Sequence, residues 1–283
     1  MQRSLVGSEM CIRDSYITIP VYPLSFDEYQ RHHRAQGTTD STDQLFSEYM
    51  MFGGMPGLFV TGQPDQDKAT EILTSIYESI VMRDVAGRYG IRDIATLEKL
   101  SRYLFSTSGN LFSVNKVANT LTSAGANASY ATVDNQISAL ERSFIVYSAQ
   151  QERMRGKELL RPQRKFYPVD NGFRNLATGF NGSDRGAQLE GIVFMELQRR
   201  GYDVTIGSLP DGEIDFIAKR GNDKQYIQVT LNMTEEQTRE RELAPLRRLG
   251  DAFPRTALTL DWHSEGMTDE GIHITNVMDW LCS

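Results

Sequence analysis

The last hundred residues alternate between helical and strand-like hydrophobic patterns. Leu189, Ile192, Val193 and Leu197 recur at helical spacing and predict a helix that ends at Gly201. Apolar stretches of strand length follow, at residues 203–209, 213–219 and 225–231. A charged helical segment, residues 234–249, then leads to predicted strands at residues 256–262 and 271–275. The order α-β-β-β-α-β predicts a mixed sheet flanked by helices over residues 181–283.

Residues 93–180 show a different pattern. Apolar positions at helical spacing predict three helices, around residues 97–105, 114–124 and 133–144. Ser113 is the expected N-cap of the second helix, and Gly125 is its expected C-terminal stop. Two strands, at residues 145–149 and 165–169, flank a basic loop. Three helices followed by a two-stranded hairpin predict a winged helix-turn-helix.

The preceding residues, 16–92, read as a mostly helical linker. Residues 16–22 predict a short strand, and Ser25 with Glu28 predicts a capping box at the start of a helix. The glycines of residues 53–57 predict a tight turn, and residues 67–89 predict one long amphipathic helix. The fold class expected for the whole chain is therefore multidomain, with α/β and α+β parts.

The first fifteen residues do not resemble a targeting signal, because they lack an apolar centre and a cleavage site of small residues. They resemble the conceptual translation of a sequencing adapter. We therefore expect residues 1–15 to be a non-native segment, the alternative being an ordinary disordered start.

Composition and charge narrow the classes of function. No run of about 18 apolar residues occurs, so no membrane partner is expected. The two cysteines, Cys11 and Cys282, lie at opposite ends of the chain, which favours a reducing, cytoplasmic setting. The net charge is −7, yet residues 93–180 carry eleven basic and seven acidic side chains. The middle of the chain is its only basic part.

The chemistry with the most specific pattern is that of a metal-dependent nuclease. Two predicted strands carry Glu213, Asp215 and Gln228 near their facing ends, and Glu190 lies on the preceding helix. Such a core holds Mg²⁺ with carboxylates, and Asp215 fits the first ligand. Gln228 is neutral where a carboxylate is needed.

Thr230 stands where a nuclease core needs a lysine to stabilise developing negative charge. Lys219 or Lys224 could supply that cation from another position. The favoured interpretation makes Glu190, Asp215 and Gln228 vestigial, with Asp215 a buried, hydrogen-bonded acid in a non-catalytic sheet. An active nuclease and an unrelated site remain as alternatives.

Nucleic-acid binding is the second candidate chemistry. Residues 151–165 hold six basic side chains that could meet phosphates, at Arg153, Arg155, Lys157, Arg161, Arg164 and Lys165. The third helix, however, presents Asp134 and Glu141 beside Asn135 and Gln136, and the acids weaken the case for DNA. The alternative is that this region packs within the protein or contacts a protein partner.

Other motifs give weaker signals. The charged run at residues 235–242 favours a solvated helix face, although Arg241 and Glu242 could instead border the nuclease-like site. No phosphate-binding loop of the Gly-x-x-x-x-Gly-Lys-Ser/Thr type occurs.

Taken in order, several blocks of residues resemble one family: the AAA-type ATPases of bacteria and archaea that carry a C-terminal domain of unknown function. The blocks lie at residues 22–29, 53–56, 76–77 with 83–84, 170–175, 189–191, 199–202, 213–216, 226–229 and 241–242. The resemblance implies a nucleotide-binding domain ahead of Tyr16, absent from this chain. ATP and Mg²⁺ are expected only in that domain, and no cofactor is expected here.

The resemblance also implies that residues 181–283 are similar to the PD-(D/E)XK nuclease fold, with eroded catalytic residues. The expected function is therefore non-catalytic recognition of DNA or of a protein partner. An active Mg²⁺-dependent nuclease and a pure protein-interaction module are the alternatives, and the oligomeric state stays open.

Overall fold

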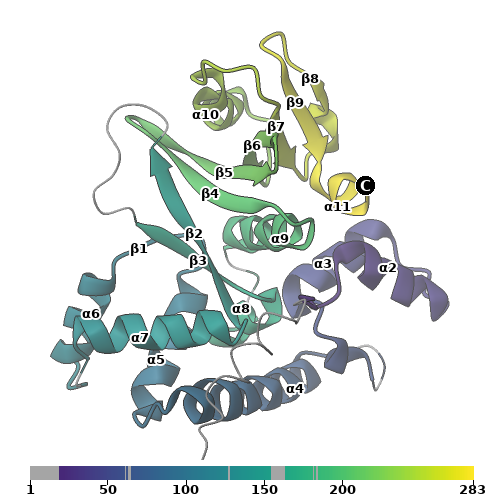
Figure 1. Ribbon diagram of the computed structural model, residues 1–283. Coiled ribbons are helices and arrows are strands. Elements are labelled where there is room, and N and C mark those ends of the chain that lie inside the picture. Colours follow the sequence, from purple (N-terminus) through teal and green to yellow (C-terminus); the bar gives the residue numbers. More distant parts are fainter. Residues whose placement is uncertain are drawn as a thin grey trace, which may run out of the picture.

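The computed structural model describes residues 19–283, apart from residues 61, 63, 64, 127, 154–162, 181 and 183. Within this part, ten α-helices surround one nine-stranded mixed sheet (Figure 1). The order of strands across the sheet is β1-β3-β2-β4-β5-β6-β7-β9-β8. The mixed α/β character expected from the sequence is confirmed. None of the described helices is both long and apolar enough to cross a bilayer.

The first described elements are helical: α2 (Phe26–Ala35), α3 (Thr42–Phe52), the 3₁₀ turn η1 (Pro56–Phe59), α4 (Gln66–Ser79) and the π-helix η2 (Ile80–Gly87). The capping box at α2 is confirmed, because Ser25 and Glu28 exchange backbone and side-chain hydrogen bonds. The strand predicted before it is wrong for residues 19–22, which lie outside every strand of the sheet. Pro20 and Pro23 lack the amide hydrogens that a strand would use.

The middle of the chain supplies helices and a hairpin: α5 (Ile94–Ser106), β1 (Leu111–Phe112), α6 (Val114–Ser123), α7 (Tyr130–Arg142), β2 (Val146–Arg153) and β3 (Arg164–Pro168). Ser113 caps α6 as predicted. One apolar core joins α4 to α7 with the start of the hairpin.

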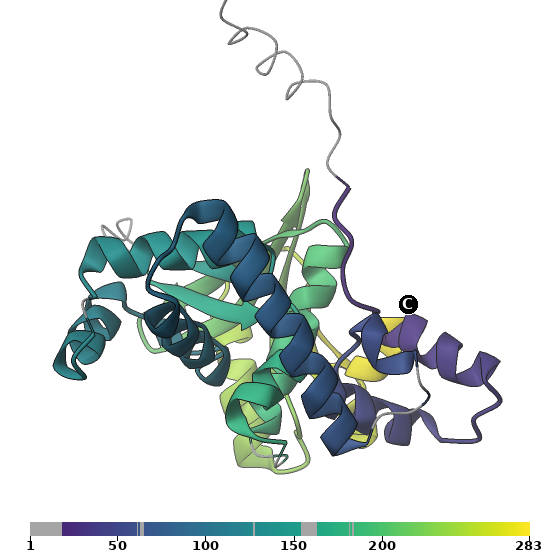
Figure 2. The same ribbon diagram turned by 90° about the horizontal axis from the view of Figure 1, so that it is seen from below.

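The remaining elements complete the sheet: α8 (Asn171–Thr178), α9 (Arg185–Arg199), β4 (Asp203–Leu209), β5 (Gly212–Arg220), β6 (Asp223–Thr230), α10 (Glu236–Arg247), β7 (Arg255–Thr259), the 3₁₀ turn η3 (Trp262–Ser264), β8 (Gly266–Met267), β9 (Ile272–Asn276) and α11 (Val277–Cys282). The predicted order of one helix, three strands, one helix and further strands is confirmed. The last helix, α11, lies against the first described helix, α2 (Figure 2).

Strand β2 belongs to both halves of the sheet. It pairs antiparallel with β3 through residues 146–150, and it pairs parallel with β4 through residues 150–153. The sheet therefore continues across residue 180, where the sequence suggests a domain boundary. The division into a linker, a middle domain and a C-terminal domain stays a prediction.

Helices α9 and α10 cover opposite faces of β5 and β6. Phe216 and Ile227 pack in the core that contains α9, whereas Ile217 and Tyr226 pack in the core that contains α10. The pairing of β4 with β5 shifts register between Thr205 and Gly207. This β-bulge interrupts the alternation of β5 next to Asp215, and bulges of this kind re-aim side chains.

Candidate functional site

An acidic cluster forms around Lys165 at the α9 face of the sheet. Side chains alternate along a strand, so Lys165 and Tyr167 of β3 point to the same face, toward α9. Lys165 Nζ lies 3.2 Å from Glu190 Oε1 of α9. The Tyr167 hydroxyl donates to the same carboxylate oxygen over 2.7 Å. Glu190 therefore receives two hydrogen bonds from one strand of the hairpin.

Strand β5 brings two more carboxylates to this cluster. Glu213 forms a close ion pair with Lys165. Asp215 lies near enough to Lys165 and Glu190 for their charges to act on it. The bulge allows Asp215 to lie on the α9 face together with its neighbour Phe216, whose ring packs tilted against the ring of Phe194 of α9. The structure thus brings Glu190, Glu213 and Asp215 together.

Gln228 of β6 contacts Asp215 but turns toward the other helix. The Gln228 amide oxygen accepts from the Asp215 backbone N–H at 3.4 Å, and its Nε2 donates to Glu242 of α10. Asp215 Oδ2 in turn accepts from the Val229 backbone N–H over 2.8 Å. The two side chains thus bond the backbone of the opposite strand where the β5–β6 ladder ends. Asp215 faces the Lys165 cluster, and Gln228 faces α10.

Burial and charge set the protonation behaviour of the cluster. Burial by itself lowers the pKa of Lys165, but Glu190, Glu213 and Asp215 outweigh it and raise that pKa above its ordinary value. Burial also raises the pKa of Asp215 well above its ordinary value, and the charge of Glu190 adds to the rise. Burial raises the pKa of Glu190 too, against the opposing effects of Lys165 and Tyr167. Burial of Glu190 and Asp215 beside a single cation therefore favours the protonated form of these two carboxyl groups.

The cluster does not fit the divalent cation of a nuclease core. Such a cation needs several oxygen ligands that converge on one open point. Here the carboxylates of Glu190 and Glu213 converge on Lys165 Nζ, which already supplies a positive charge. In the described part of the chain, no group of three or more His, Cys, Asp or Glu side chains is arranged to hold a metal ion.

Lys165 is the residue of this cluster that sequence reasoning missed. The basic run at residues 151–165 favoured a role in phosphate contact, whereas the side chain of Lys165 is only 6% exposed. The one available signal was its spacing of two residues from Tyr167, which places both side chains on one face of a strand. The two lysines considered as substitutes lie elsewhere: Lys219 pairs with Glu152 and Lys224 pairs with Asp251.

Of the other basic residues predicted to contact nucleic acid, the structure describes Arg153 and Arg164. Arg155, Lys157 and Arg161 lie outside the described residues. Arg153 ends β2 and is exposed. Arg164 is held by the acids of α7, 3.3 Å from Glu141 and 3.7 Å from Asp134.

Glu242 lies against Gln228 on the α10 face of the sheet rather than on a fully solvated helix face. It accepts from Gln228 and pairs with Arg241, and its side chain is mostly buried. Of the two residues considered at the border of the nuclease-like site, Glu242 contacts Gln228, whereas Arg241 is exposed.

A second buried acid, Asp170, lies at the N-cap of α8. Its two carboxylate oxygens accept from the backbone N–H groups of Gly54 and Gly172, at 2.7 and 2.8 Å. Gly53 adopts a φ of 79°, and a Cβ there would collide with Asp170, so this loop needs glycine. Burial raises the pKa of Asp170 to about 6, although both amide bonds oppose the rise.

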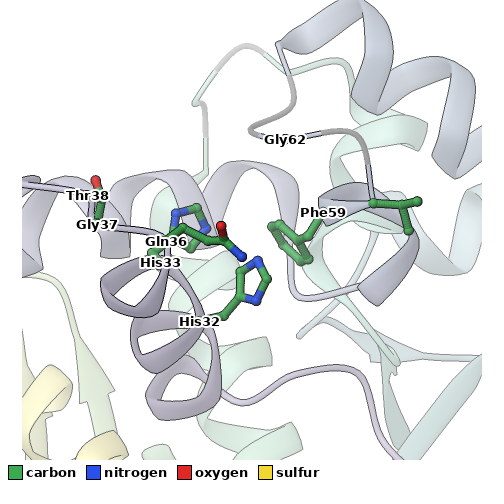
Figure 3. A pocket seen from close by; sticks show the side chains of 8 residues that line it. His32, His33, Gln36, Gly37, Thr38, Phe59 and Gly62 are labelled. Carbon is green, nitrogen blue, oxygen red and sulfur yellow. The ribbon is translucent and has the colours of Figure 1, made fainter.

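A separate hollow of about 480 Å³ lies between the end of α2 and η1 (Figure 3). His32 and Phe59 face each other across it, and His33 lies beside them. The His33 ring stacks 4.3 Å from the ring of Tyr29, and burial lowers its pKa. The described residues that line the hollow include no acid to act with these imidazoles.

Comparison with known proteins identifies the family. The family model described as "Domain of unknown function (DUF8612)" matches residues 43–184, about half of the 283 residues. The chain belongs to this family. The match runs from α3 to the start of α9 and so includes Lys165, Tyr167 and Asp170.

Two curated relatives are similar to this DUF8612 chain over most of its length. An uncharacterized protein of Haemophilus influenzae is 35% identical over 266 residues, 94% of the chain. The uncharacterized protein MJ1544 of Methanocaldococcus jannaschii is 26% identical over 243 residues, 82% of the chain. The aligned parts cover 65% of the first relative and 53% of the second. No solved structure matches the chain.

Proposed function

We propose that this chain is a recognition region without nuclease activity, and that it serves a longer AAA-type ATPase by binding a protein partner. The order α5, α6, α7 and the β2–β3 hairpin supports a winged-helix middle part. The order from α9 to β7 supports a core similar to the PD-(D/E)XK nucleases. ATP and Mg²⁺ would belong to a part of such a protein that this chain does not contain.

The position of Lys165 carries the proposal. A nuclease uses its carboxylates to bind a metal and its lysine to stabilise the attacked phosphate. In this chain the lysine comes from β3 and neutralises the carboxylates directly, while Gln228 faces α10. The carboxylates that would bind a metal and the lysine that would stabilise the phosphate are thereby paired with each other.

Charge pairing on the hairpin favours a protein partner over DNA. Arg164 is engaged by Glu141 and Asp134, and Lys165 is buried among acids. A DNA-reading surface instead needs basic side chains that are available to phosphates. Asp134 also lies on α7, the helix that would enter the major groove in a winged helix.

A plasmid-nicking assay with Mg²⁺ or Mn²⁺ tests the absence of nuclease activity. The chain and its Asp215→Ala variant are compared at equal concentration. We expect the same background from both, and metal-dependent nicking that is lost in the variant would contradict the proposal.

The choice of partner has its own test. Labelled duplex DNA is titrated at several salt concentrations against the chain and against a variant with charge reversal at Arg153, Arg155 and Lys157. If the chain binds DNA tightly and in a salt-dependent way, and this variant does not, the proposed protein partner is wrong and DNA is the partner.

A further inference from the structure

An exposed aromatic residue occupies a backbone position that normally belongs to glycine. Phe144 follows the C-cap of α7 with a φ of 57°, in the left-handed region. The Ile145 N–H donates to the Leu140 carbonyl there, which is the closure of a helix that usually ends in glycine. Left-handed backbone is unfavourable for a bulky residue, and such positions gather at functional sites.

Burial of the Phe144 side chain does not offset this backbone strain. Its side chain is 58% exposed, so packing in the core does not explain why it stands there. Glycine would satisfy the same helix end without strain. We therefore attribute the presence of phenylalanine at this position to its exposed ring.

A second irregular element lies next to it. The segment η2 is a π-helix of eight residues. Such helices are rare in proteins, and those that occur often lie at functional sites. The Ser143 hydroxyl donates to the Asp84 carbonyl of η2 over 2.9 Å, which joins the end of α7 to this segment. Met82 of η2 is 52% exposed. An exposed apolar residue therefore stands within two positions of each partner in this hydrogen bond.

The charges around these side chains are positive. Arg83 and Arg142 are exposed, and within the described residues neither has an ion-pair or hydrogen-bond partner. Of the nearby acids, Asp84 pairs with Arg88 and Glu141 pairs with Arg164, whereas Glu78 at the end of α4 is exposed. The two unpaired arginines complement a negatively charged partner.

We infer that Met82, Arg83, Arg142 and Phe144 form a docking surface for an acidic peptide segment that carries an apolar side chain. The ring and the thioether receive the apolar residue, and the two guanidinium groups pair with flanking carboxylates. The inference rests on the proposed role in protein recognition and names its surface.

Fluorescence polarisation tests the inference with a labelled synthetic peptide in which leucine and phenylalanine alternate with aspartate and glutamate. A second peptide carries asparagine and glutamine in place of the acids. We expect the chain to bind the acidic peptide at least about tenfold more tightly than the neutral one, as desolvated charge pairs predict.

Two variants locate the surface. Phe144→Gly should weaken binding of the acidic peptide by about tenfold or more, as a central aromatic contact predicts, while its melting temperature stays equal or rises. Arg83→Ala combined with Arg142→Ala should remove the preference for the acidic peptide. Trp262→Ala, at an exposed aromatic residue elsewhere, is the matched control and should bind as the unmodified chain does.

Failure to bind the acidic peptide, or binding that both variants leave unchanged, would overturn the inference. Binding of labelled duplex DNA that depends on Arg83 and Arg142 would also overturn it, in favour of a nucleic acid. Either failure leaves the nicking assay unaffected, so the absence of nuclease activity is judged separately.

Discussion

Two buried acidic centres of this protein are neutralised in different ways. Around Lys165, carboxylates of α9 and β5 share one ammonium group. At the N-cap of α8, Asp170 accepts hydrogen bonds from the backbone N–H groups of Gly54 and Gly172, and the charge of Arg199 acts on it more weakly. The Lys165 ammonium group gives a full positive charge to Glu190 and Glu213, whereas Asp170 is held by amide dipoles. The first centre should therefore be the more sensitive to loss of its cation, and in the second Asp170 should titrate near pH 6.

The largest expected effect is that of Lys165→Met. Removing one partner of a buried ion pair leaves the others uncompensated, so the free energy of unfolding should fall by about 3–5 kcal/mol. Urea unfolding followed by circular dichroism measures this. The double variant Lys165→Met/Glu213→Gln should recover part of the loss. A loss below about 1 kcal/mol, typical of exposed pairs, would show that the cluster is not held by Lys165.

The pH response of Asp170 comes next. Its pKa is about 6 in the folded chain against an ordinary 3.8, so the folded state binds this proton more tightly. The resulting stability is fully present below about pH 4 and is lost as the pH rises through about 6, a change of about 3 kcal/mol at most.

Unfolding free energies measured between pH 4 and pH 8 test this against Asp170→Asn, which lacks the titrating group. Between pH 4 and pH 8 the unmodified chain should lose up to about 3 kcal/mol of stability relative to the variant as Asp170 ionises. Parallel curves would mean that Asp170 does not titrate in this range.

A smaller effect is expected for Gln228→Glu. The new carboxylate would face Glu242 of α10 and lose the amide hydrogen bond to it, which should cost about 1–2 kcal/mol at neutral pH. The loss should shrink at pH 5, where carboxyl groups begin to protonate. Unfolding at both pH values measures it, and a stabilised variant would mean that Gln228 faces Lys165 instead.

The smallest effect is expected at the exposed counterpart of Lys165. Lys219 pairs with Glu152 over 2.7 Å, but the two side chains are 38% and 34% exposed. Lys219→Met should therefore change the free energy of unfolding by less than about 1 kcal/mol. A loss as large as that of Lys165→Met would remove the contrast between buried and exposed lysines in this sheet.

Most of the fold was predictable because its elements follow local periodicity. The strands β4, β5 and β6 and the helix α9 lie within a few residues of the predicted ranges. The strand wrongly predicted before α2 shows the limit. Residues 19–22 have strand-like composition, but Pro20 and Pro23 lack amide hydrogens and these residues lie in no strand of the sheet.

The site was only partly predictable, because it depends on geometry between distant segments. Glu190, Glu213 and Asp215 followed from a spacing pattern, and the structure does gather them. Lys165 arrives from a strand on the other side of β2 and β4, which no local pattern reveals. The bulge in β5 is likewise set by its pairing with β4, so the opposite orientations of Asp215 and Gln228 could not be read from alternation alone.

The double pairing of β2 has a practical consequence for anyone who dissects this protein. A fragment that ends near residue 180 would keep β2 but lose β4, and residues 150–153 would then present unsatisfied backbone groups along a free edge. Open edges of this kind recruit other chains and lead to aggregation. Expression of the two halves as separate pieces should therefore give insoluble material, even where each half keeps its own apolar interior.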